Sequence, residues 1–269
     1  MSIFKNLKKY NEIGKTNFRN NFVYIWDSLF GKAFFIGIII FIFSHLWSTI
    51  FKQSGVSVIS GFTLPMMVWY LVLTESILVS LSGVIRDVSS EIKSGDVANY
   101  LTKPYNYIFY KYAISIGKGA FNFFLFFLVG GIMAYLTVGG ISVEWYTIPF
   151  ILLVVFLAIT LSYFIIINIG LAAFWIEETN GLAFIYNKFV FVIGGMLVPL
   201  EILPLWLAKI GLLLPFSYIA YHPAKLFVMF DFTYFFNIFI IQLAWIVVFI
   251  IISLFIYSIV SKKVSINGG

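Results

Sequence analysis

The chain has 269 residues, of which 62% are hydrophobic and only 10% charged, and its mean hydropathy is +1.03. This composition excludes an ordinary soluble domain and indicates a polytopic membrane protein. The net charge of +6 is not accompanied by a nucleic-acid-binding motif, and the lack of cysteine excludes disulfides and thiolate metal sites.

Residues 1–32 predict a basic amphipathic helix in the inner membrane interface. Apolar residues recur at near-helical spacing from Phe4 to Leu29, and Lys, Arg and other polar residues fill the positions between them. The alternative is an ordinary polar leader that precedes the first membrane span.

Six apolar runs follow, and each is long enough to cross a bilayer as a helix of roughly 20 residues. We expect an all-α protein with six spans, at Ala33–Phe51, Phe62–Ile85, Ala120–Val138, Pro149–Trp175, Gly181–Val198 and Phe235–Val260. In this arrangement 14 of the 17 Lys and Arg residues lie on one side of the membrane. Both termini are therefore expected in the cytoplasm.

A compact polar insert, RDVSSEIKSGDVANYLTKP, separates the second and third spans at Arg86–Pro104. Its pattern predicts two short helices outside the bilayer, the first ending at Gly95 and the second N-capped by Asp96 and stopped by Pro104. A charged, folded knob in this place favours docking to a soluble partner. A solvated connecting loop is the alternative.

Few ionisable or amide groups lie within the spans. Glu75 lies midway along the second span, where a carboxylate needs water, a partner or a proton. It could line a pore, bind a cation, carry a proton or bond a neighbouring helix. Asn168 fits a helix–helix hydrogen bond, and Glu177 and Glu178 fit either a solvated helix end or an acidic gate. These four residues are the candidate translocation path.

Several prolines lie in the stretch that follows the fifth span. Within it, the apolar run Pro204–Leu214 is too short to cross a bilayer. It could begin as a helix at Pro204. We expect residues 199–223 to form an outer re-entrant or interfacial segment, although a plain hydrophobic loop is the alternative. The candidate outer gate comprises Pro199, Glu201, Pro204, Trp206 and Pro215.

Catalytic motifs are missing from the sequence. It has no GxxxxGK[ST] loop for ATP, no metal-ligand spacing and no Gly-x-Ser-x-Gly elbow. We therefore expect no enzyme and no cofactor in this chain. A membrane protein with a docking knob and no energy source of its own fits a permease that is driven by a separate ATPase.

The order of these elements resembles the ABC-2 type permeases over nearly the whole chain, in particular the branch similar to daunorubicin-resistance exporters. The resemblance is carried by Gly95, Leu101, Lys103 and Pro104 in the knob, and by Phe174-Trp175 followed by the glycine- and proline-marked stretch from Gly195 to Pro223. Members of that branch often have Arg at the position of Lys103.

The resemblance implies that two permeases, identical or different, pair around a central path. Each would dock a cytoplasmic ATP-binding subunit, which holds ATP and Mg²⁺, through the knob as a coupling helix. The docking candidates are Arg86, Glu91, Lys93, Gly95, Asp96, Leu101, Lys103 and Pro104. Re-entrant helices after the fifth span would close the outer side.

The sequence thus predicts the membrane subunit of an ATP-driven exporter in a bacterial cytoplasmic membrane. Its substrate would be a drug-like, cationic or lipidic molecule. A carrier driven by an ion gradient and a membrane scaffold without transport are the two alternatives, and a partner ATPase would distinguish them.

Overall fold

The computed structural model describes residues 3–23, 26, 31, 34–101, 105–176 and 178–267. Within these residues the chain is helical apart from turns, irregular connections and one isolated bridge between Ile59 and Phe62. The expected all-α polytopic membrane fold is confirmed.

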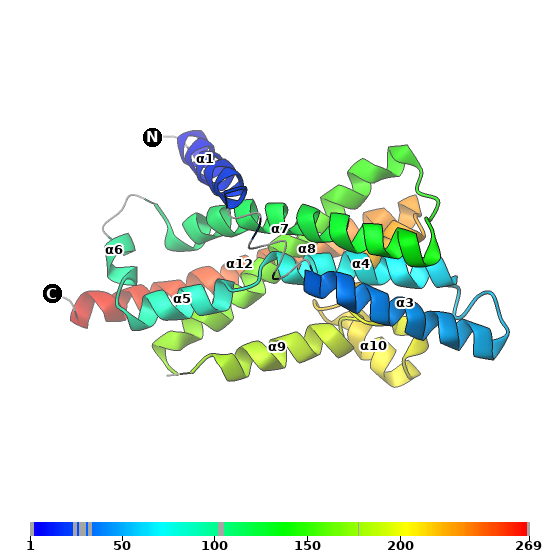
Figure 1. Cartoon of the computed structure of the whole chain (residues 1–269). Coiled ribbons are helices and arrows are strands. Elements are labelled where there is room, and N and C mark those ends of the chain that lie inside the picture. Colours follow the sequence, from blue (N-terminus) through cyan, green and yellow to red (C-terminus); the bar gives the residue numbers. More distant parts are fainter. Residues whose placement is uncertain are drawn as a thin grey trace.

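Five helical segments in the described residues are long and apolar enough to cross a membrane. They contain α3 (Phe34–Ser54), α4 with α5 (Leu64–Ser80 and Val84–Lys93), α7 (Tyr107–Val138), α8 (Ile148–Leu171) and α12 (Phe232–Asn267). Their long axes run in similar directions through the molecule (Figure 1). Each overlaps an apolar run that the sequence assigns to a span, but most of α5 lies in the polar insert, and α7 begins at Tyr107 rather than at the expected Ala120.

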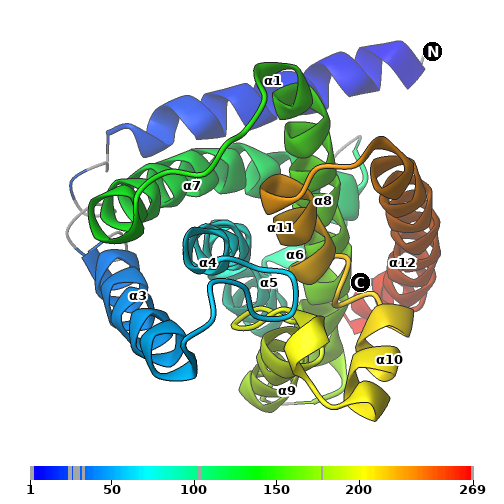
Figure 2. The ribbon, with the colours of Figure 1, turned by 90° about the vertical axis from the view of Figure 1, so that its right-hand side faces the viewer.

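The centre of the bundle is made by α4 and α8, with α3, α7 and α12 around them (Figure 2). α8 is buried along most of its length, whereas α12 exposes a long apolar face that includes Phe236, Ile240 and Phe255. Such an apolar face is stable only against hydrocarbon, so α12 presents it to lipid.

The expected fifth span is shorter than predicted. Its residues form α9 (Asn180–Val192), a helix of 13 residues and about 20 Å, which is less than the ~30 Å hydrocarbon core. The span predicted at Gly181–Val198 is therefore a short helix rather than a full-length one, although it runs from the α5–α6 end of the bundle towards α10 (Figure 1). The helix ends at Val192, and Gly195 just beyond it has φ +68°, a backbone conformation that does not continue a helix.

Two short helices follow α9, namely α10 (Leu205–Leu213) and α11 (Tyr221–Val228). The nine residues of α10 do not cross the bundle, as the sequence predicted for this stretch. Both helices lie towards the end opposite to α5 and α6 (Val97–Leu101) (Figure 1).

The N-terminal helix α1 (Ile3–Asn21) lies across the other helices and packs on α7 (Figure 2). The two helices approach so closely that a Cβ on Gly117 would lie 2.1 Å from the Gly14 carbonyl oxygen. A second contact is the hydrogen bond that the backbone N–H of Asn106 donates to the Tyr10 hydroxyl at 3.1 Å. α1 is thus seated at the end of the bundle where α5 and α6 lie.

Candidate functional site

The polar insert forms two short helices, as predicted, and α5 is seated on α8. Val84 and Val88 are buried, and a Cβ on Gly170 would lie only 2.8 Å from the Val88 side chain. Valine therefore occupies the space that this glycine leaves on α8. Arg86 and Lys93 of α5 are exposed on the side that faces the connection between α8 and α9.

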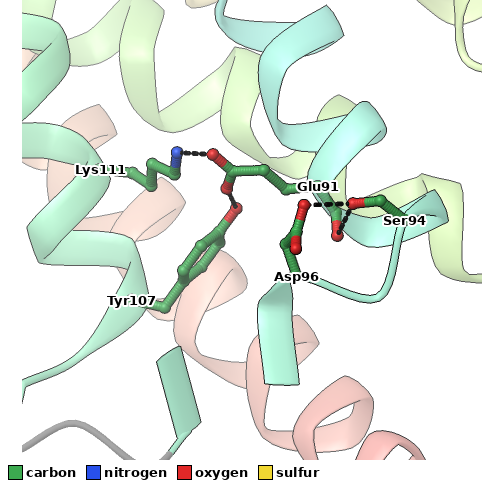
Figure 3. Close-up of polar contacts among 5 residues, drawn as sticks. All are labelled: Glu91, Ser94, Asp96, Tyr107 and Lys111. Carbon is green, nitrogen blue, oxygen red and sulfur yellow. Dashed lines mark hydrogen bonds and ion pairs between the residues drawn. The ribbon is translucent and has the colours of Figure 1, made fainter. Parts of the chain in front are cut away.

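Glu91 holds α5 to α7 rather than pointing into solvent. Its carboxylate accepts a hydrogen bond from the Tyr107 hydroxyl at 2.9 Å and forms an ion pair with Lys111 (Figure 3). The Glu91 and Lys111 side chains are only 23% and 11% exposed. Both Glu91 oxygens therefore have partners within this chain, so a docking partner would not find a free carboxylate at this position.

The turn between α5 and α6 is built by Ser94, Gly95 and Asp96. Gly95 has φ +80°, a conformation that favours glycine, and its N–H bonds to the Ile92 carbonyl. The Ser94 hydroxyl donates to the Asp96 carboxylate at 2.6 Å (Figure 3). Asp96 directly precedes α6 and is exposed.

The other docking candidates are described only in part. The last residue of α6 is Leu101, but its side chain lies outside the described residues. Lys103 and Pro104 also lie outside them.

A polar groove opens beside α5, which sequence reasoning did not predict. Its volume is about 490 Å³, and it lies between α5 and the segment that joins α8 to α9. Arg86 and Lys93 line one side, and Glu178 and Asn180 line the other. The Thr179 hydroxyl bridges the two sides by donating to Ser89 at 3.1 Å.

A second cavity, of about 390 Å³, shares Arg86 and Asn180 with this groove. It extends between α4, α8 and α9 as far as Ser162 and Tyr186, whose hydroxyls are 2.9 Å apart. The groove and the cavity together make a partly polar opening from the α5 end into the bundle.

Three of the four translocation-path candidates lie apart from one another. Glu75 is 5% exposed in α4, and in the described part of the chain no hydrogen bond reaches its carboxylate. Asn168 donates to the Phe164 carbonyl within α8, while its own amide oxygen is buried without a partner among the described residues. Glu178 lies in the groove beside α5, and Glu177 lies outside the described residues.

A polar cluster around Glu201 ties the 3-10 turn at Leu200–Ile202 to α11. The Glu201 carboxylate accepts from the Tyr221 hydroxyl at 2.6 Å and pairs with Lys225 at 2.5 Å. Lys225 also donates to the Tyr221 hydroxyl at 3.0 Å. Tyr221 and Lys225 are four residues apart on α11, a spacing visible in the sequence, but sequence reasoning gave neither a role in the outer gate.

The remaining candidates for the outer gate differ in their exposure to solvent. Pro199 and Pro215 are buried, whereas Pro204 is exposed and Trp206 is 65% exposed at the start of α10. The buried prolines flank the α10 segment, so they shape the turns at which the chain enters and leaves it.

The irregular segment after α9 is fixed from α4. The Tyr70 hydroxyl donates to the Gly195 carbonyl, and the Thr74 hydroxyl donates to the Met196 carbonyl at 2.8 Å. Two side chains of a spanning helix thus satisfy backbone carbonyls of the irregular segment. These two contacts place residues 195–196 against α4.

His222 is buried beside the polar cluster around Glu201. Its Nδ1 lies 2.7 Å from the Tyr234 hydroxyl, and its ring stacks on Tyr218. Burial, together with the charge of Lys225, lowers the pKa of His222 to about 3, so the imidazole is neutral at physiological pH.

The family model described as ABC-2 family transporter protein matches residues 35–268 of the chain. No curated protein and no solved structure matches the chain. The match begins one residue into α3 and includes the other spanning helices of the described residues, the α5–α6 knob, α10 and α11.

Proposed function

The chain belongs to the ABC-2 family of transporter proteins and is a membrane permease component of an ABC transporter, and we propose that a separate ATP-binding subunit drives it as an exporter. The observation that carries the proposal is the α5–α6 knob, which projects a charged surface while it is fixed to two spanning helices. Val88 fixes it to α8 and Glu91 to α7.

The docking surface would be the exposed part of the knob at the mouth of the groove. Arg86, Lys93 and Asp96 are exposed there, and α5 is fixed to α7 and α8, so these residues can receive a partner and transmit its movement. Glu91 would act indirectly, because its pair with Lys111 transfers a push on α5 to α7.

The substrate path would begin at the groove and cavity between α4, α5, α8 and α9. α9 covers this region through Tyr186 and Val190 but exposes Phe184, Ile185 and Phe189 on its other side. A second permease packed on this side would enclose the opening, which supports a homodimer or heterodimer. Serine, asparagine and tyrosine groups in the cavity suit an amphiphilic or cationic substrate.

The positive-inside rule supports an arrangement with both termini in the cytoplasm of a bacterial cell. α1 would then lie in the inner interface, residues 86–104 would face the cytoplasm, and residues 199–223 would form the outer closure. The Glu201–Lys225 pair would hold that closure shut.

The test is co-purification of the ATP-binding subunit with knob variants. We expect Lys93→Glu and Arg86→Glu to weaken retention of the subunit by at least about tenfold, because a reversed charge repels the surface that the native one attracts. The matched control is Lys52→Glu, which makes the same charge change at the opposite end of the bundle on α3.

Retention should be unchanged in the control. Equal retention by all three variants would exclude the knob as the docking surface. Absence of any co-purifying ATP-binding subunit from the native protein would exclude the ATP-driven mechanism.

A further inference from the structure

A groove of about 460 Å³ lies where α1 crosses α7 and α8. One wall is the edge of α1 that carries Asn11, Lys15 and Arg19, four residues apart. The floor is formed by Tyr112 and Ile116 of α7 and by Phe156 of α8. The groove therefore has a polar, basic wall and an apolar floor.

The basic wall carries a net positive charge. Arg19 has no acidic partner among the described residues, whereas Lys15 pairs with Glu12 at 3.1 Å. The Lys15 and Glu12 side chains are 54% and 60% exposed, so water screens this pair and Lys15 can exchange its partner. An anion in the groove would therefore meet one free and one loosely held cation.

The floor offers hydrocarbon contact and no charge. The hydroxyl of Tyr112 is already bonded to that of Thr160 at 2.9 Å, so the tyrosine contributes its ring. Phe156 is 46% exposed on a spanning helix, and this part of the floor is open to the surrounding bilayer. In a membrane such a surface is covered by an acyl chain.

The two halves of the groove lie at the two depths that a phospholipid requires. α1 crosses the bundle at the α5–α6 end, whereas α7 and α8 run from there into the membrane (Figures 1 and 2). The basic wall is therefore at the level of the headgroups, and the floor is at the level of the chains.

We propose that this groove binds an anionic phospholipid from the leaflet at the α5–α6 end, with its phosphate on Arg19 and Lys15 and one acyl chain along Ile116 and Phe156. The bound lipid fills the space between α1 and the spanning helices and so holds α1 on α7. This site is independent of which substrate the permease moves and of its ATP-binding subunit.

The experiment is native mass spectrometry of the purified full chain with phosphatidylglycerol or phosphatidylcholine added at equal concentration. The native protein should retain phosphatidylglycerol in preference to phosphatidylcholine. Arg19→Gln should lower phosphatidylglycerol retention about fivefold, the effect of one basic residue at a membrane surface. Lys8→Gln is the matched control, since it removes the same charge from an exposed position of α1 outside the groove.

A second pair of variants tests the floor. Ile116→Trp should fill the groove and reduce retention of both lipids, whereas Ile132→Trp, on an exposed face of α7, should not. Equal losses in Arg19→Gln and Lys8→Gln would show general attraction to the helix and overturn the proposal. Retention unaffected by Ile116→Trp would overturn it as well.

Discussion

Val88 of α5 fills the space left by Gly170 of α8, and a Cβ on that glycine would lie 2.8 Å from the Cβ of Val88. No real pair of carbon atoms tolerates this distance without movement. The position of the knob against the bundle is therefore set by the absence of one methyl group.

Gly170→Ala should displace α5 and lower the free energy of unfolding by about 1–3 kcal/mol, the usual range for overpacking. Thermal unfolding of the purified protein measures the loss. The control is Gly181→Ala in α9, where a Cβ would meet nothing within 4 Å. A Gly170→Ala variant as stable as this control would contradict the packing argument.

The Glu91–Lys111 pair should behave as a coupled unit. Glu91→Gln and Lys111→Met each leave a half-buried partner without its counter-charge, so each should cost about 1–3 kcal/mol after allowance for partial solvent screening. The double variant should cost clearly less than the two single costs together. Denaturant or thermal unfolding of the four proteins gives the coupling energy.

The exposed Glu12–Lys15 pair of α1 provides the comparison for this cycle. Glu12→Gln should change stability by less than about 0.5 kcal/mol, because that pair is mostly in water. Strictly additive costs at Glu91 and Lys111 would show that the two residues act separately.

His222 should make the protein less stable in acid. Its pKa is about 3 in the folded chain and 6.5 in an unfolded one, so the unfolded state takes up the proton first. Stability is therefore unaffected above about pH 6.5 and falls by up to about 1.4 kcal/mol per pH unit from there towards pH 3.

His222→Gln keeps a polar side chain that does not titrate, so its unfolding midpoint should depend less on pH between 6.5 and 4. Thermal unfolding across this range compares the two proteins. Parallel curves for the native chain and the variant would mean that His222 is not protonated on unfolding.

The topology can be tested with single cysteines, because the native chain has none. Ser54 ends α3 and Ser142 precedes α8, so both lie at the end of the bundle opposite to the α5–α6 turn that holds Ser94. Ser54→Cys and Ser142→Cys should react with an impermeant thiol reagent in intact cells. Ser94→Cys should react only after the membrane is opened, and labelling of it from outside would reverse the orientation.

The long spans could be predicted from the sequence because crossing a bilayer requires only a sufficient length of apolar residues. The two short helices of the knob could also be predicted, because Gly95 and the four-residue spacing of the apolar residues Val88 and Ile92 are local sequence signals. The fifth span was overestimated because the apolar run continues to Val198, whereas the helix ends at Val192 and Gly195 adopts a φ of +68°. Composition carries no information about where the backbone leaves the helical conformation.

The partners of the candidate residues could not be predicted in the same way. Glu91 meets Lys111 and Glu201 meets Lys225 only after distant segments are packed together. Glu91 therefore looked like a free docking charge, although the fold uses it internally. The placement of Glu178 beside α5 is likewise a result of how α8 and α9 are joined.

The close approach of Gly14 to Gly117 also constrains the order in which the protein is assembled. α1 is synthesised before α7, and its seat on α7 follows on the order of a hundred residues later, roughly 5–20 s at ribosomal speed. During this interval the basic, amphipathic α1 has no protein surface to cover its apolar face, so the membrane interface itself must shelter it. The first two spans are therefore inserted before α1 reaches its final position on α7.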